Sequence, residues 1–193
     1  VEKFITEDPA GPIRDLLFLL IACRQNAVLI FDHELGGGAN LYRNQLIGKI
    51  LKLGSAVLLY TEHPWELKPR LRCYYKDHSV EFNVSSLEEL RDLAKRIGVT
   101  KIFYNNMVSY TSPLQVLDLI RELKRSEKAR LIVAIHDYYP VCPSYNLIND
   151  RGIFCGIPQN TRQCEECLAH NQYVEALPTK DIKAWRITWE RCL

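Results

Sequence analysis

The sequence has no long hydrophobic run and no marked excess of charge of either sign. The longest apolar stretch, residues 16–23, is far shorter than the roughly 20 residues that a membrane-spanning helix needs. Lysine and arginine number 25 against 23 aspartate and glutamate residues, which gives a net charge of +2 and no basic stripe, so nucleic acid is not an expected partner. Internal repeats and low-complexity tracts are also lacking. We expect one cytoplasmic globular domain and leave peripheral membrane contact open.

Buried strands and amphipathic helices alternate along most of the chain. This alternation predicts an α/β fold with a doubly wound, mostly parallel, Rossmann-like sheet that is covered on both faces. Residues 70–84 alternate apolar with polar side chains, which predicts a hairpin. The other expected strands are residues 27–31, 56–60, 101–104 and 131–135, and the expected helices are residues 40–53, 86–98 and a segment from residue 112 onward.

The periodicity also suggests how the chain is divided. Residues 1–26 are expected to form a lead-in segment and a helix, and residues 27–193 to form the α/β domain. Regular patterning stops after the strand that ends at His136, so a long cysteine-containing loop is expected over residues 138–178. A terminal helix is then expected over residues 181–193.

Polar residues stand at the ends of four expected strands. Ligands of doubly wound sheets bind outside the carboxyl ends of the strands, where the strand order reverses. Polar residues also stand at the ends of buried strands where no ligand binds. For any single pair of these residues, a purely structural role therefore stays open. The residues concerned are Asp32, His33, Thr61, Glu62, Asn105, Asn106, His136 and Asp137.

A triglycine segment, Gly36, Gly37 and Gly38, follows the first strand and precedes a helix. Glycines let the backbone approach a ligand, and the helix start offers unpaired N–H groups to a phosphate. The segment resembles part of a dinucleotide-binding pattern, although Leu41 replaces its third glycine and Glu62 stands near the place of its acidic ribose ligand. A nicotinamide-dependent enzyme and a tight turn without a ligand therefore both stay open.

Four clustered cysteines, Cys142, Cys155, Cys164 and Cys167, fall inside the expected loop. Four thiolates can close a tetrahedral zinc site and hold a loop that lacks a core. The alternative is four independent, reduced cysteines. A redox role is less favoured, because no strand delivers the Cys-x-x-Cys pair to a helix start.

Aromatic residues Tyr138, Tyr139 and Tyr145 flank His136. Aromatic faces with amide neighbours suit the C–H faces and hydroxyl edges of a sugar. Packing of the long loop accounts for the same tyrosines equally well.

Taken together, these segments resemble the amino-terminal, acceptor-side domain of retaining glycosyltransferases of the GT-B fold, of the glycosyl transferase group 1 type. The resemblance covers residues 27 to about 190, and its departure from the family is the lack of a carboxyl-terminal nucleotide-sugar domain. The matching segments are residues 30–33, 36–42, 135–140, 142–144 and 146–147, followed by Cys155, Cys164 and Cys167.

The resemblance implies a transferase that moves a sugar from a nucleotide-sugar donor to a glycan or glycolipid acceptor in polysaccharide biosynthesis. It implies that His136 is catalytic, facing donor sugar and acceptor, and that the triglycine segment lies near the donor phosphates. The chain alone is expected to be inactive, and no cofactor is required for the chemistry beside a candidate structural zinc. The candidate substrate-binding residues are Asp32, His33, Gly36, Gly37, Gly38, Asn40, Asn105, Asp137 and Tyr138.

Two other functions stay open. One is an NAD(P)-dependent oxidoreductase domain, for which the triglycine segment would bind the dinucleotide. The other is a non-catalytic, zinc-stapled module that binds sugars.

Overall fold

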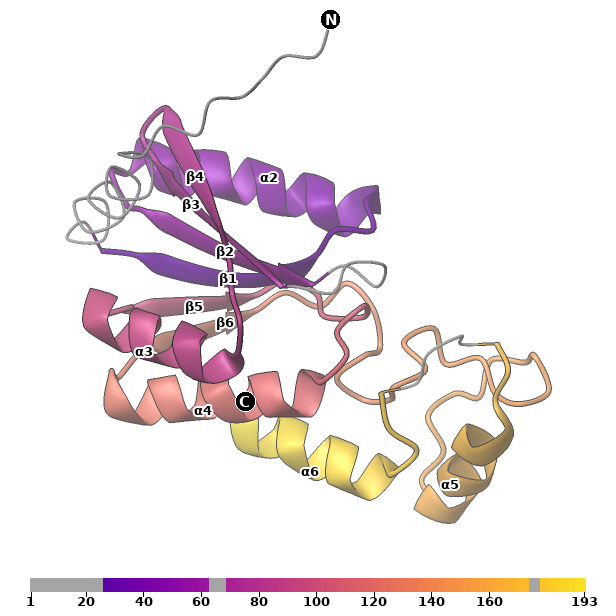
Figure 1. Ribbon diagram of the computed structural model, residues 1–193. Helices are drawn as coiled ribbons and strands as arrows, with labels where there is room; N and C mark the ends of the chain where they lie inside the picture. Colours follow the sequence, from indigo (N-terminus) through magenta and orange to yellow (C-terminus); the bar gives the residue numbers. More distant parts are fainter. Residues whose placement is uncertain (1–25, 63–68, 174–177) are drawn as a thin grey trace, which may run out of the picture.

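A six-stranded sheet in the order β4-β3-β2-β1-β5-β6 forms the centre of the protein, as the computed structural model shows for residues 26–62, 69–173 and 178–193 (Figure 1). Strands β1, β2, β5 and β6 are parallel, and the β3–β4 hairpin joins the edge of β2 in antiparallel fashion. The strands are β1 (Val28–His33), β2 (Val57–Glu62), β3 (Arg70–Tyr75), β4 (His78–Asn83), β5 (Lys101–Tyr104) and β6 (Arg130–Val133). The predicted α/β class with a mostly parallel sheet is confirmed.

Helices cover both faces of this sheet (Figure 1). One face carries α2, and the other carries α3 and α4, with α6 packed against α4. Helix α5 lies apart from the sheet and contacts α6. The helices are α2 (Gly37–Lys52), α3 (Leu87–Ile97), α4 (Pro113–Ser126), α5 (Thr161–His170) and α6 (Ile182–Cys192).

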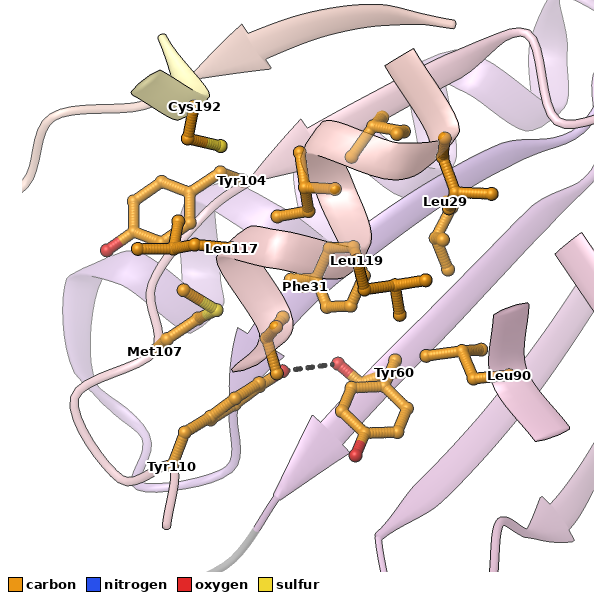
Figure 2. Packing of buried hydrophobic residues seen from close by; sticks show 14 of the residues in the cluster. Leu29, Phe31, Tyr60, Leu90, Tyr104, Met107, Tyr110, Leu117, Leu119 and Cys192 are labelled. Atoms are coloured by element: carbon orange, nitrogen blue, oxygen red, sulfur yellow. Dashed lines mark hydrogen bonds between the residues drawn. The ribbon is translucent and has the colours of Figure 1, made fainter. Parts of the chain in front are cut away.

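The central strand β1 is buried along its whole length because it lies between two helical layers. Its side chains alternate: Val28 and Ile30 join the core under α2, whereas Leu29 and Phe31 join the larger core under α3 and α4. Figure 2 shows part of this larger core, in which the ring of Phe31 meets that of Tyr60 edge-on at 5.7 Å. A continuous apolar strand is therefore what this position in the sheet requires.

The order of the strands reverses beside β1. The chain passes from β1 outward to β2 and the hairpin, and then returns to place β5 and β6 on the other side of β1. The carboxyl ends of β1 and β5 consequently border the crevice where ligands of such sheets bind.

Both ends of α3 are set by local sequence signals, as expected. The Ser86 hydroxyl accepts the N–H of Glu89 at 3.2 Å, and the Glu89 carboxylate accepts the N–H of Ser85 at 2.7 Å, which is a capping box around the start of α3. Gly98 ends α3 with a left-handed φ of 70°. These two signals give α3 the boundaries that the sequence predicted.

Several expected boundaries were wrong. Strands β1 and β2 each continue two residues past the expected end, to His33 and Glu62. Helix α2 begins at Gly37 and not at residue 40, and β6 ends at Val133 and not at residue 135. Helix α5 interrupts the loop expected over residues 138–178, because the Asn160 side chain caps it and Leu168 is buried on its inner face. The helix expected near the start of the chain lies outside the described residues.

Within the described residues, no helix combines the length and the apolarity needed to cross a bilayer.

The contact of α6 with the segment after β6 yields a prediction on stability. Trp185 is fully buried and its indole N–H donates to the carbonyl oxygen of Tyr139 at 2.8 Å. We expect Trp185→Ala to lower the free energy of unfolding by about 3–5 kcal/mol, measured by urea denaturation, because it leaves a large cavity. Ile187→Ala, on the exposed face of the same helix, should change it by less than about 0.5 kcal/mol; equal losses in both variants would contradict this packing.

Candidate functional site

The candidate site lies where the carboxyl ends of β1 and β5 meet the first turns of α2 and the segment that follows β6. The structure brings together most of the residues that the sequence singled out there. A chain of hydrogen bonds runs from β1 through α2 to the segment after β6. Its members are Asp32, His33, Asn40, Arg43, Asn105 and His136.

A buried ion pair lies at the bottom of this site. Asp32 is fully buried, and its Oδ2 lies 3.1 Å from Nη1 of the buried Arg43. The same guanidinium donates to the carbonyl oxygen of His33 at 3.1 Å. Burial of a charge is costly without a partner, so Arg43 is what allows a carboxylate at the end of the central strand. The Oδ1 atom of Asp32 is buried and has no hydrogen-bond partner among the residues that the structure describes.

Arg43 was not singled out from the sequence. Its position was nevertheless encoded, since Asn40, Arg43 and Ile47 share the buried face of α2 at helical spacing. An arginine on an inward face next to a strand that ends in aspartate is a signal for a buried pair.

Asn40 closes the turn between β1 and α2. Its Nδ2 donates to Oδ2 of Asp32 and to the carbonyl oxygen of His33, both at 2.8 Å, and its Oδ1 accepts the N–H of Gly36 at 2.6 Å. The amide therefore makes three bonds within the protein. These bonds give Asn40 a structural task in shaping the turn; the expected contact with a substrate stays a prediction.

The triglycine segment is exposed, and two of its members adopt backbone angles that favour glycine. Gly36 has φ 84° and Gly37 has φ 80°, a region that other residues enter only with strain. A Cβ at either position would meet no atom of the described chain within 4 Å. Backbone conformation, and not crowding against α2, is thus the reason for glycine at these two positions. Gly38 already belongs to the first turn of α2, which contains no acidic residue.

His136 lies beside this helix start and is exposed. Its Nε2 is 3.0 Å from Oδ1 of Asn105, whose Nδ2 donates to the carbonyl oxygen of Ala39 at 3.0 Å. The ring of Tyr42 meets the imidazole edge-on at 5.4 Å. Because Asn105 presents its oxygen to the ring, Nε2 carries the proton in the neutral imidazole and Nδ1 is left as an acceptor.

Asp137 shapes the turn that follows His136. Its Oδ2 accepts from Nδ2 of Asn106 and its Oδ1 accepts the N–H of Tyr139, both at 2.8 Å. Both carboxylate oxygens therefore have partners within the protein. The role of Asp137 in substrate binding stays a prediction.

The three tyrosines around His136 divide between two environments. Tyr139 is buried against Trp185, with ring centroids 4.8 Å apart, so packing accounts for it. Tyr138 is 44% exposed and lies 6.0 Å from the ring of Phe154, and Tyr145 is exposed as well. Of these three tyrosines, Tyr138 and Tyr145 thus present aromatic surface to solvent.

His33 and Glu62 both turn inward. The Nδ1 of His33 accepts the N–H of Leu35 at 3.1 Å. Burial lowers the pKa of His33 and outweighs the neighbouring Asp32 carboxylate, which raises it. Glu62 is buried and its carboxylate accepts from the Tyr60 hydroxyl and from both the N–H and the hydroxyl of Thr111, each at 3.0 Å.

Tyr110 ties the ends of the first two strands together and was not singled out from the sequence. Its hydroxyl lies 3.0 Å from the carbonyl oxygen of Asp32 and 2.9 Å from that of Tyr60, a contact drawn in Figure 2. This buried hydroxyl fixes the spacing of β1 and β2 where the site begins.

The four clustered cysteines gather away from the sheet, around a cavity of about 500 Å³ beside α5. All four are free thiols. Burial raises the pKa of Cys142 to about 11, and burial also raises the pKa of Cys164. Across residues 26–62, 69–173 and 178–193, no three His, Cys, Asp or Glu side chains are grouped as ligands around one point.

Comparisons with protein-family models, with curated proteins and with solved structures find no match to this chain. The assignment of a function therefore depends on the geometry of the site.

The inward-facing imidazole of His33 gives a pH dependence. Its folded-state pKa lies below the usual 6.5, so the unfolded chain binds the proton more readily. We expect the free energy of unfolding to fall as the pH drops through 6.5 and below. His33→Asn keeps an acceptor for the N–H of Leu35 but cannot titrate, and its denaturation curves should fall less steeply with acidification. Parallel pH profiles for the two proteins would contradict this expectation.

The buried ion pair gives a second prediction. Arg43→Met should lower the free energy of unfolding by about 3 kcal/mol or more, because it leaves the Asp32 carboxylate buried without a counter-charge. Asp32→Asn combined with Arg43→Met should recover part of that loss. A double-mutant cycle by chemical denaturation measures both effects, and strict additivity would show that the two groups do not interact.

Proposed function

We propose that this chain is the acceptor-side, Rossmann-like half of a GT-B glycosyltransferase that acts on a glycan or glycolipid. A carboxyl-terminal domain outside these residues would hold the nucleotide-sugar. The observation that carries the proposal is the link from the exposed His136 through Asn105 to Ala39 in the first turn of α2. One acceptor nitrogen and one helix start thereby lie close together, as a transferase of this kind would need.

The chemistry of glycosyl transfer matches these two groups. The leaving group is a nucleoside diphosphate, and the N–H groups and dipole at the start of α2 favour such an anion. Gly36 and Gly37 adopt a positive φ without strain, and the space beside them is open, so a ligand can approach their backbone. His136, with Nδ1 as acceptor, suits a hydrogen bond from a sugar hydroxyl that strengthens as the reaction proceeds.

Apolar surface around the site supports a sugar and a second domain as partners. Leu35, Leu41 and Tyr42 flank the triglycine segment and are 51%, 61% and 45% exposed, and Ile135 before His136 is 73% exposed. Exposed apolar side chains near a polar crevice favour contact with the C–H faces of sugar rings or with another protein surface. The same exposed apolar side chains would also suit peripheral contact with a membrane that holds a glycolipid.

The dinucleotide alternative is disfavoured by Glu62. An oxidoreductase would need that carboxylate to bind ribose hydroxyls, yet it is 8% exposed and accepts three hydrogen bonds from Tyr60 and Thr111. Ribose binding would have to break this cluster. Titration with NAD and NADP separates the two functions, because tight binding of either would favour the oxidoreductase.

The test uses the protein encoded by the full reading frame. We expect that frame to continue into a second α/β domain, and we expect the whole protein to transfer sugar from a nucleotide-sugar. A frame without that domain would instead favour the sugar-binding module without catalysis.

In the whole protein, His136→Ala should lower kcat by about 10²-fold or more, because the lost hydrogen bond acts in the transition state. His170→Ala is the matched control, since it removes another exposed histidine, on α5, whose Nδ1 lies 3.1 Å from the carbonyl oxygen of Glu166 in the same helix. Transfer rates close to those of the unmodified protein in both variants would remove His136 from the reaction.

A further inference from the structure

We propose that Cys142, Cys155, Cys164 and Cys167 bind one Zn²⁺ that holds the segment between β6 and α6 together. The observation behind this proposal is that all four thiols line one cavity of about 500 Å³, although they come from three separate parts of the segment. Soft thiolate ligands in a set of four are the usual ligands of a structural zinc ion.

Each thiol is presented by a defined local structure. The N–H of Cys142 closes a turn on the carbonyl oxygen of Tyr138 at 3.0 Å. The N–H of Cys155 donates to the carbonyl oxygen of Leu147 at 2.9 Å, next to the isolated bridge between Ile148 and Phe154. Cys164 and Cys167 lie three residues apart on α5, so they share one face of that helix.

A hydrogen-bond donor lies beside each of two of the four sulfurs. Nη2 of Arg186 lies 3.7 Å from the sulfur of Cys164, and Nδ2 of Asn171 lies 3.8 Å from the sulfur of Cys167. Arg186 also donates through Nε to the carbonyl oxygen of Val141 at 3.1 Å. A zinc ion with four thiolates carries a net charge of −2, so a guanidinium and an amide beside the sulfurs stabilise it.

The segment around the cavity has no separate apolar core, since its buried side chains Tyr139, Leu147 and Leu168 belong to the main core of the domain. Between β6 and α5 it has no further helix or strand beyond the isolated bridge. Its large apolar side chains Ile153, Phe154 and Ile157 are exposed. A bound metal compensates for a missing core, because the free energy of metal binding becomes free energy of folding.

Binding requires the four thiols to converge, and the backbone around Cys155 permits this. Gly152 and Gly156 flank it with φ 74° and 65°, and glycine adapts its backbone at low cost. Each thiol releases its proton to solvent as a Zn–S bond of about 2.3 Å forms. Four bonds to sulfur then replace four S–H bonds, with no oxidation or reduction.

The test measures zinc by mass spectrometry in the chain purified from zinc-supplemented cells. We expect one zinc ion per chain in the unmodified protein and its loss in Cys164→Ser combined with Cys167→Ser. Cys192→Ala is the matched control, because Cys192 is a buried free thiol on α6 that does not line the cavity; this variant should keep its zinc. Zinc retained in the double variant, or protein that holds iron and sulfide instead, would overturn the proposal.

A second measurement covers the case in which the double variant fails to fold. Unmodified protein stripped with a chelator and titrated with Co²⁺ should show the intense visible bands of a tetrahedral tetrathiolate site, and Cys155→Ser should lose part of that intensity. Stripped protein that takes up neither Co²⁺ nor Zn²⁺ would equally overturn the proposal. Neither measurement involves a sugar donor or acceptor, so its outcome is independent of the proposed transferase function.

Discussion

The candidate site depends on one buried carboxylate, that of Asp32. It belongs to the last but one residue of the central strand β1 and is held by Asn40 and Arg43 from α2. These contacts fix the first turns of α2 against the strand end, and Asn105 then ties His136 to the same turn. A charge in this position is unfavourable unless each neighbour is in place, so the carboxylate specifies one arrangement of β1, α2 and the segment after β6.

The strand order explains why these pieces meet where they do. Since β2 and β5 lie on opposite sides of β1, the polypeptide leaves β1 and β5 in diverging directions, and ligands of doubly wound sheets bind at such a reversal of strand order. The hairpin of β3 and β4 extends the sheet beyond β2, away from β5. Inward-facing groups such as Glu62 and Tyr110 stabilise the strand ends from within, while His136 and the triglycine segment remain exposed.

Much of the fold could be predicted because it depends on local signals. The apolar run at the start of β1, the capping box at Ser86 and the left-handed Gly98 each act within a few residues. Tyr110 could not be placed in the same way, because its partner Asp32 is 78 residues distant in the sequence and becomes a neighbour only in the folded sheet. Helix α5 was missed for a related reason: its apolar face is short, and its cap, Asn160, resembles an ordinary loop residue.

The site at the end of β1 and the cysteine cluster are stabilised in different ways. The site at β1 is built on a sheet whose core surrounds it, so its groups are pre-positioned for a ligand. The cysteines lie in a segment fixed by scattered hydrogen bonds, by Arg186 and by the indole of Trp185. Trp185 bonds to Tyr139, three residues after His136, so α6 contacts the part of the chain that leads from the imidazole to Cys142. The proposed metal would act on the far end of that part, at a distance from the strand ends where the candidate site lies.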